Sequence, residues 1–340
     1  MNPPDDPDDA PGDGTGDALG DGPGAAPGLN PSLELELTAV PPPDPGAEPE
    51  GFVVTVDAAD RIHFLDWGGP TGDGAPGILL IHGLGQTAWS WAPVARRLRA
   101  ARRVVATDLR GHGLSDAPTH GYEPDSLAGD VVAVAEGSGL LEITGDGVVL
   151  AGHGFGACVA AWTATILGPR CAGVVLVDGG WQDVKATSGL DPEEFLRAIE
   201  EPPEVLRSMG AFLADRAAFD PATWDADQDR AARSDVVEVP AGRVVPATRP
   251  HALEGSVRAM FAYRPSAVLA AIRAPLVALA AADDEAGTMA SSMAEVQQAR
   301  QAAGRPAIPV ARFPADGHNL MRYRPVEVAA AILAVGDPTH

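Results

Sequence analysis

The chain has 340 residues, of which 45% are apolar, and a formal net charge of −23. This length allows one large hydrophobic core or two modest ones, and the apolar fraction is that of a globular protein. No cluster of Lys or Arg offers the positive surface that phosphate groups need, so we expect no nucleic-acid partner.

The negative charge is concentrated at the beginning of the chain. Residues 1–50 contain 12 Asp or Glu, 12 Pro and 8 Gly, with no Lys or Arg. A segment of this composition buries too little apolar surface to offset the entropy of ordering it. We therefore predict that residues 1–50 form a disordered acidic tail. The tail has neither the positive region nor the apolar region of a secretory signal peptide.

Two further features of the composition concern the membrane and the compartment. No apolar run approaches the ~20 residues that a membrane-spanning helix needs, so we expect no membrane partner. The two cysteines, Cys158 and Cys171, have no metal-type spacing and are too few for a disulfide framework. The resulting expectation is a cytoplasmic protein.

From residue 51 the sequence alternates between predicted strands and predicted helices. Two short apolar segments joined by a polar turn predict an antiparallel hairpin. The run ILLI, continuously apolar, predicts a strand buried on both faces. The predicted strands in this half are 52–56, 62–67, 78–81, 104–106, 148–151 and 174–177. The predicted helices are 88–101, 126–136 and 155–167, with Ser126 as the N-cap of the second.

The same alternation returns after a long insertion. It predicts strands at 276–280 and 310–313 and helices at 290–303 and 325–335. Strands that alternate with helices argue for a parallel sheet covered on both faces, formed here by residues 51–180 and 271–340. Residues 181–270 show helical patterns and little strand signal. We predict that they form a helical cap over the C-terminal edge of the sheet, where open α/β sheets bind ligands.

Four short motifs follow predicted strands along the chain. They are HGLG at 82–85, DLRGHGLS at 108–115, GHGFG at 152–156 and DGHN at 316–319. In this order and spacing, residues 51–340 resemble the α/β-hydrolase fold superfamily, and in particular its capped, esterase-like members. The resemblance implies an α/β fold with a mostly parallel, eight-stranded sheet, flanking helices and a helical cap.

The third motif departs from the pattern of the superfamily at its central residue. The nucleophile elbow G-x-S-x-G presents a serine at a strained strand-to-helix turn. Here that position is Gly154, which fits the turn but has no Oγ, so no acyl-enzyme can form. The oxyanion donors that the resemblance implies are the backbone N–H groups of Leu84 and Phe155, and these do not depend on a serine.

The resemblance also assigns the other catalytic positions. His318 matches the general base. The acid is expected after the seventh strand, where Asp284 fits best and Asp283 is the fallback. Some members take the acid from the end of the sixth strand, which makes Asp178 the alternative. Either acid would hold the imidazole in the tautomer that accepts a proton.

Three interpretations of Gly154 remain open at this point. His318 could activate a water molecule for direct hydrolysis of a carboxylic ester or lactone, with a small apolar substrate under the cap. The chain could instead be an inactive pseudo-hydrolase that binds a small apolar ligand. Gly154 could also be a replacement of serine in an ordinary esterase. We favour a hydrolase with impaired or unconventional chemistry. No metal-binding pattern and no dinucleotide-binding turn occurs, so we expect neither a metal nor another cofactor.

Overall fold

The computed structural model describes residues 40–56, 59–71, 74–143, 147–281 and 287–336. Its centre is an eight-stranded sheet with the order β1-β2-β4-β3-β5-β6-β9-β10. β2 is antiparallel to both of its neighbours, and the strands from β4 to β10 in this order are parallel. The strands are β1 (Glu50–Thr55), β2 (Arg61–Gly68), β3 (Gly77–Ile81), β4 (Val104–Thr107), β5 (Val148–His153), β6 (Cys171–Val177), β9 (Leu276–Ala281) and β10 (Val310–Phe313). The predicted α/β fold with a mostly parallel sheet is confirmed.

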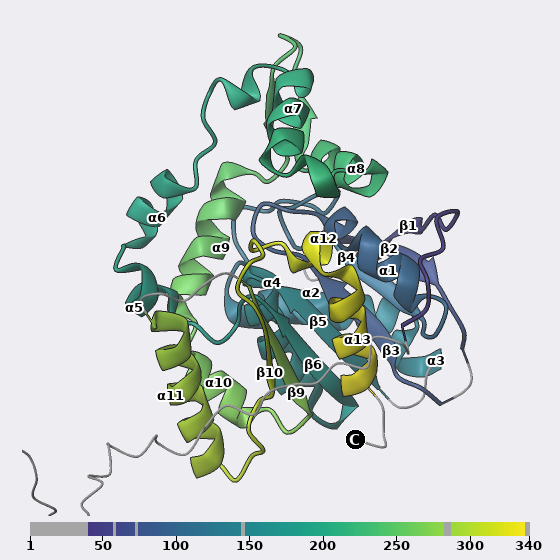
Figure 1. Cartoon of the computed structure of the whole chain (residues 1–340), viewed down its shortest axis with the longest axis vertical. Helices are drawn as coiled ribbons and strands as arrows, with labels where there is room; N and C mark the ends of the chain where they lie inside the picture. Colours follow the sequence, from purple (N-terminus) through teal and green to yellow (C-terminus); the bar gives the residue numbers. More distant parts are fainter. Residues whose placement is uncertain (1–39, 57–58, 72–73, 144–146, 282–286, 337–340) are drawn as a thin grey trace, which may run out of the picture.

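Helices cover both faces of this sheet (Figure 1). On one face lie α1 (Ala92–Leu98), α12 (Leu320–Tyr323) and α13 (Pro325–Val335), whose buried residues share one core cluster. On the other face lie α2 (Pro124–Gly137), α3 (Leu140–Ile143), α4 (Phe155–Leu167), α10 (Pro265–Ala271) and α11 (Thr288–Ala302). Short 3₁₀ turns, η3 (Ala88–Trp91) and η4 (Gly168–Arg170), precede α1 and follow α4.

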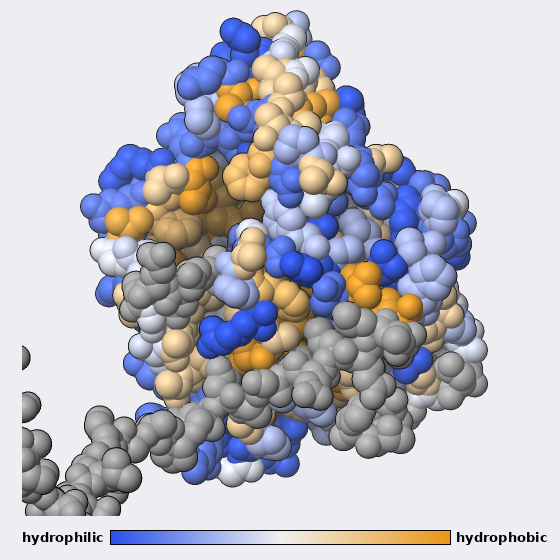
Figure 2. Space-filling view, viewed as in Figure 1, coloured by the Kyte–Doolittle hydropathy of each residue, from blue (hydrophilic) through white to orange (hydrophobic). Residues whose placement is uncertain are grey.

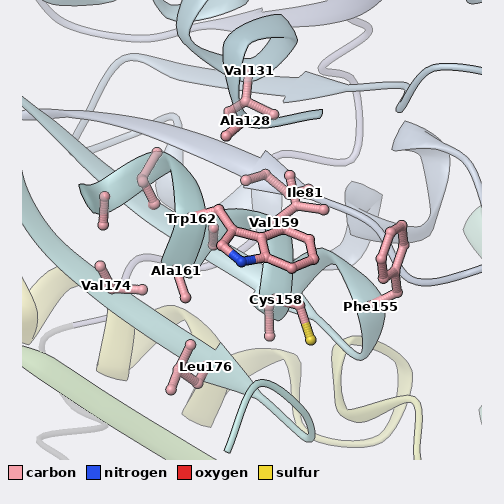
Figure 3. Packing of buried hydrophobic residues seen from close by; sticks show 14 of the residues in the cluster. Ile81, Ala128, Val131, Phe155, Cys158, Val159, Ala161, Trp162, Val174 and Leu176 are labelled. Atoms are coloured by element: carbon pink, nitrogen blue, oxygen red, sulfur yellow. The ribbon is translucent and has the colours of Figure 1, made fainter. Parts of the chain in front are cut away.

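The core lies in two layers because successive strand residues point to opposite faces of the sheet. In β3, Leu79 and Ile81 join the cluster on the α4 side, whereas Ile78 and Leu80 join the cluster on the α13 side. Every residue of β3 is buried, as the continuous apolar run predicts. Figure 3 shows the α4 side, where Trp162 and its neighbours pack against the strands.

Two helix boundaries match the sequence prediction and others differ. The helix predicted over 88–101 is the 3₁₀ turn η3 followed by the shorter α1, and α11 begins two residues earlier than predicted. The bounds of α4 and α13 are those predicted. The helix α2, however, begins at Pro124 and not after Ser126, and its N-cap Glu123 makes no side-chain cap. Proline suits the first helical turn because its missing N–H would have no partner there.

The insertion between β6 and β9 contains helices and one small hairpin. Its elements are α5 (Val184–Ser188), α6 (Pro192–Ala198), η5 (Val205–Arg207), α7 (Met209–Phe219), η6 (Pro221–Thr223), α8 (Ala226–Ser234), β7 (Val236–Glu238), β8 (Val244–Pro246) and α9 (Pro250–Ala262). The hairpin β7–β8 was not predicted, because strands of three residues leave too short a pattern to recognise. In Figure 1 these elements stand beside and above the sheet.

Residues 40–49, which the composition assigns to the acidic tail, pack against α1. The guanidinium of Arg96 donates to backbone carbonyls of Asp44, Pro45 and Ala47 and is itself buried. Arg96 also pairs with Glu48 at 3.2 Å and with Asp227 of α8 at 3.0 Å. Glu48 also pairs with Arg230 of α8, so this short segment contacts both α1 and the insertion. Residues 1–39 lie outside the described part of the chain.

Candidate active site

The turn between β5 and α4 has the geometry of a nucleophile elbow. Its central residue Gly154 has φ 53° and ψ −115°, a combination that residues with a side chain adopt only under strain. A Cβ on Gly152 would lie 2.2 Å from the carbonyl oxygen of Gly156, and one on Gly156 would lie 2.3 Å from that of His82. Both flanking glycines are therefore needed for the close approach of strand and helix.

His318 faces this elbow from the loop between β10 and α12. Its Nδ1 lies 2.5 Å from Oδ2 of Asp178, the residue that directly follows β6. The other carboxylate oxygen of Asp178 accepts the N–H of Ala281 at 2.8 Å. Asp178 has φ 44°, which is uncommon for a residue with a side chain, although Asp tolerates it better than most. Asp283 and Asp284, the preferred acids on sequence grounds, lie outside the described residues.

The second ring nitrogen of His318 is directed at Gly154. A Cβ on Gly154 would lie 3.1 Å from Nε2. In the neutral form of this ring, Nδ1 carries the proton, because a carboxylate only accepts hydrogen bonds, and Nε2 carries the lone pair. The side chain of His318 is 63% exposed, and no hydrogen-bond partner for Nε2 is found within the described ranges. The imidazole is therefore free to accept a proton from a molecule in the pocket.

His153 and Gln86 hold the loop of His318 against the elbow. Nε2 of His153 lies 3.0 Å from the carbonyl oxygen of His318, and its Nδ1 lies 3.0 Å from Oε1 of Gln86. Oε1 of Gln86 also accepts the N–H of Gly83 at 3.0 Å. Burial, and then the neighbouring His318, lower the pKa of His153 well below its usual value, so this ring is neutral. Its single N–H can therefore donate to only one of the two oxygens that its ring nitrogens contact. This geometry gives His153 a supporting role beside the elbow, whereas Gln86 was not predicted from the sequence. The only signal for it is a polar residue after the HGLG turn.

Two backbone N–H groups belong to residues that line the same pocket, Leu84 and Phe155. Phe155 is the first residue of α4, so its N–H has no partner within the helix. Neither this N–H nor that of Leu84 donates to another backbone carbonyl among the residues that the structure describes. Both residues line the pocket that also contains Gly154 and His318. The sequence-predicted positions are thus brought together, apart from those in 282–286.

The pocket lies between the carboxyl ends of the strands and the insertion. Its volume is about 1310 Å³. The space-filling view shows a hollow lined by apolar residues on the side of the insertion (Figure 2). Apolar side chains from the sheet domain and the insertion contribute to its wall, among them Leu84, Phe155, Leu196, Ile199, Phe212, Trp224 and Met260.

Other reactive groups near the elbow do not form an alternative centre. Cys158 lies one helical turn beyond Gly154, and burial raises the pKa of its thiol to about 12. A thiol that stays protonated is a poor nucleophile. In the described ranges, no group of three or more His, Cys, Asp or Glu side chains is arranged to hold a metal ion. No helix in the same ranges is long and apolar enough to cross a membrane.

Known proteins with similar sequences are matched over part of their length. Mouse epoxide hydrolase 4 is 34% identical over 129 residues, which are 37% of this chain and 33% of that protein. The 2-(acetamidomethylene)succinate hydrolase of Mesorhizobium japonicum is 31% identical over 143 residues, which are 42% of this chain and 49% of that protein. The chain thus spans a third to a half of the length of these relatives.

Similarity of structure extends over most of the chain. A solved structure of E-2-(acetamidomethylene)succinate hydrolase superposes with a TM-score of 0.68 at 22% identity and covers 84% of this chain and 98% of that chain. At this identity the similarity shows the fold. The model of the family described as "Alpha/beta hydrolase family" matches residues 78–331, which include the elbow and His318. The chain therefore belongs to the alpha/beta hydrolase family.

Proposed function

We propose that the protein hydrolyses carboxylic esters or lactones by direct attack of a water molecule that His318 activates. One observation carries this proposal. Nδ1 of His318 is held by a carboxylate at 2.5 Å, while its Nε2 faces Gly154 and is open to the pocket. A general base in this arrangement needs a proton donor within hydrogen-bond distance of Nε2. A water molecule can be that donor, because position 154 has no serine hydroxyl.

We assign the acid of the dyad to Asp178 in place of Asp284. Its oxygens contact His318 Nδ1 and the N–H of Ala281, so the carboxylate is fixed in orientation. A carboxylate at Nδ1 orients the ring and stabilises the imidazolium that forms when Nε2 takes a proton. Asp284 then has no role in proton transfer.

The distances restrict where the reactive water can stand. A C–C bond is about 1.5 Å long, so Cα of Gly154 lies at most about 4.6 Å from Nε2. A water midway between them would be about 2.3 Å from both atoms, closer than a hydrogen bond of about 2.8 Å allows. The water must therefore lie beside this line, on the pocket side of the imidazole.

The reaction then takes place in two proton transfers. Nε2 of His318 removes a proton from the water as its oxygen attacks the carbonyl carbon. The N–H groups of Leu84 and Phe155 stabilise the negative charge on the carbonyl oxygen. The imidazolium next gives its proton to the departing alkoxide, and the C–O bond breaks to leave an acid and an alcohol. No covalent enzyme intermediate forms.

We further propose that residues 181–270 act as the cap of this site and that the substrate is small and mainly apolar. The support is that α5, α6, α8 and α9 contribute residues to the wall of the pocket. The names of the relatives, an epoxide hydrolase and a succinate-derivative hydrolase, agree with a hydrolytic reaction but match only part of each protein.

The test compares the native protein with His318→Ala on p-nitrophenyl esters and γ- and δ-lactones of increasing chain length. We expect native turnover without a burst and a loss of about 100-fold or more in kcat/KM for the variant. His318 is mostly exposed, so this substitution leaves the fold intact. Equal rates for the two proteins would refute the proposal. Absence of turnover, together with ligand binding in the pocket, would identify an inactive member of the family.

A further inference from the structure

Arg322 lines the pocket, and hydrogen bonds hold its guanidinium in one orientation. It lies on α12, four residues after His318, and lines the same pocket. Its Nε donates to Oγ1 of Thr223 at 2.7 Å, and its Nη2 donates to the backbone carbonyl of Asp220 at 2.6 Å. The guanidinium also stands 5.6 Å from the centre of the Trp224 ring. These contacts fix its orientation.

The fixed guanidinium keeps one edge free. Arginine has five N–H groups, and the hydrogen bonds to Thr223 and Asp220 use two of them. The two N–H groups on the Nη1–Nη2 edge are parallel and match the two oxygens of a carboxylate. Among the residues that the structure describes, no carboxylate forms an ion pair with Arg322. The carboxylate of Asp220 itself accepts from Ala222 N–H and Thr223 Oγ1, both at 3.0 Å.

Other arginines in the wall differ from Arg322 in one of two ways. Arg216 is paired with Glu201. Arg197 and Arg249 have no ion pair among the described residues, but no side-chain hydrogen bonds fix their guanidinium groups there either. A cation that binds only neutral acceptors retains its attraction for an anion, and partial removal from water strengthens that attraction.

We propose that Arg322 binds a free carboxylate of the substrate. The substrate class is then an ester or lactone that carries a second, ionised carboxyl group, such as a half-ester of a dicarboxylic acid. This assignment rests on the proposed function, in which a water molecule activated by His318 attacks the other carboxyl derivative in the same pocket. The apolar wall would hold the carbon chain between the two groups.

The test measures binding, so that it does not depend on turnover. The probes are 4-oxopentanoate, 5-oxohexanoate and 6-oxoheptanoate, each beside its primary amide, because a ketone resembles an ester and is not hydrolysed. Calorimetry gives Kd for native protein, Arg322→Gln, Arg322→Lys and Arg249→Gln. Arg249 is an exposed arginine that lines the same pocket and serves as the matched control.

We expect at least one keto acid to bind native protein about tenfold or more tightly than its amide, as a charge-assisted hydrogen bond implies. Arg322→Gln should remove this preference and leave the Kd of the amide within about twofold. Arg322→Lys should keep part of it, and Arg249→Gln should keep all of it. Equal binding of acid and amide to native protein would overturn the proposal. A preference for the acid that persists in Arg322→Gln would also overturn it. So would an equal loss of affinity for the acid and the amide in this variant, because that result indicates an arginine with a purely structural role.

Discussion

The substitution Gly154→Ser returns a hydroxyl to the elbow, and its consequences can be worked out from the geometry. The new Cβ would lie 3.1 Å from Nε2 of His318, so the imidazole must move by a few tenths of an ångström. The Oγ would then lie within hydrogen-bond reach of Nε2, next to the N–H of Phe155. This arrangement supports attack by serine and formation of an acyl-enzyme.

The same substitution strains the backbone. At φ 53° and ψ −115°, a residue with a side chain costs about 1–3 kcal/mol relative to glycine. Each kcal/mol lowers Tm by about 2–4 °C in a large domain, so Gly154→Ser should melt about 2–12 °C below the native protein. Gly154→Ala introduces the same Cβ without the hydroxyl and should lose the same stability.

The assay follows p-nitrophenolate release from p-nitrophenyl acetate in a stopped-flow instrument. We expect Gly154→Ser to show a burst of about one equivalent and a gain of about 100-fold or more in kcat/KM. Gly154→Ala should show neither. If Gly154→Ser folds but stays at the native rate without a burst, or if Gly154→Ala gains as much, then the elbow does not present its side chain to His318 as described.

Three further predictions concern the acid, the cysteine and pH. Asp178→Asn should lower native kcat/KM by about 100-fold or more, while Asp284→Asn changes it less than twofold. The reverse order would assign the role of the acid to Asp284. Cys158 should resist iodoacetamide at pH 8 until the protein unfolds, since burial raises its pKa to about 12; labelling of folded protein, read by mass spectrometry, would contradict this. Burial and the nearby His82 lower the pKa of His112 to about 3. As the pH falls below about 6.5, the imidazole of His112 therefore becomes protonated in the unfolded chain but stays neutral in the folded protein. Its contribution to the free energy of unfolding should therefore fall by up to about 1.4 kcal/mol per pH unit on acidification, and His112→Gln should lose less stability than native protein between pH 6.5 and 5.5 in urea titrations.

Much of the fold could be predicted because its strongest elements are local patterns. The run at 78–81 is apolar at every position, and such a strand fits only between two layers of helices. The helices α4 and α13 are bounded by Gly154 and Pro325, which mark helix starts clearly. The hairpin β7–β8 escaped because its pairing depends on neighbours that a short pattern does not reveal.

The candidate site was predictable where a motif fixes the position. Gly154 and His318 each follow a strand within a recognisable motif. The choice of acid could not be made in this way, because Asp178 and Asp284 both follow buried strands. The contact of Asp178 with His318 joins residues 140 positions apart. Arg322 depends on partners 99 and 102 positions away, so its role is equally invisible to local patterns.

The contacts of residues 40–49 have a practical consequence for anyone who shortens the gene. Composition alone would place the cut at residue 51, which removes Glu48 and the carbonyl acceptors of the buried Arg96. The remaining guanidinium would keep Asp227 as its ion-pair partner but lose most of its hydrogen bonds, at a cost typical of a broken buried network. An expression clone that begins at codon 40 avoids this loss and omits the acidic residues of positions 1–39.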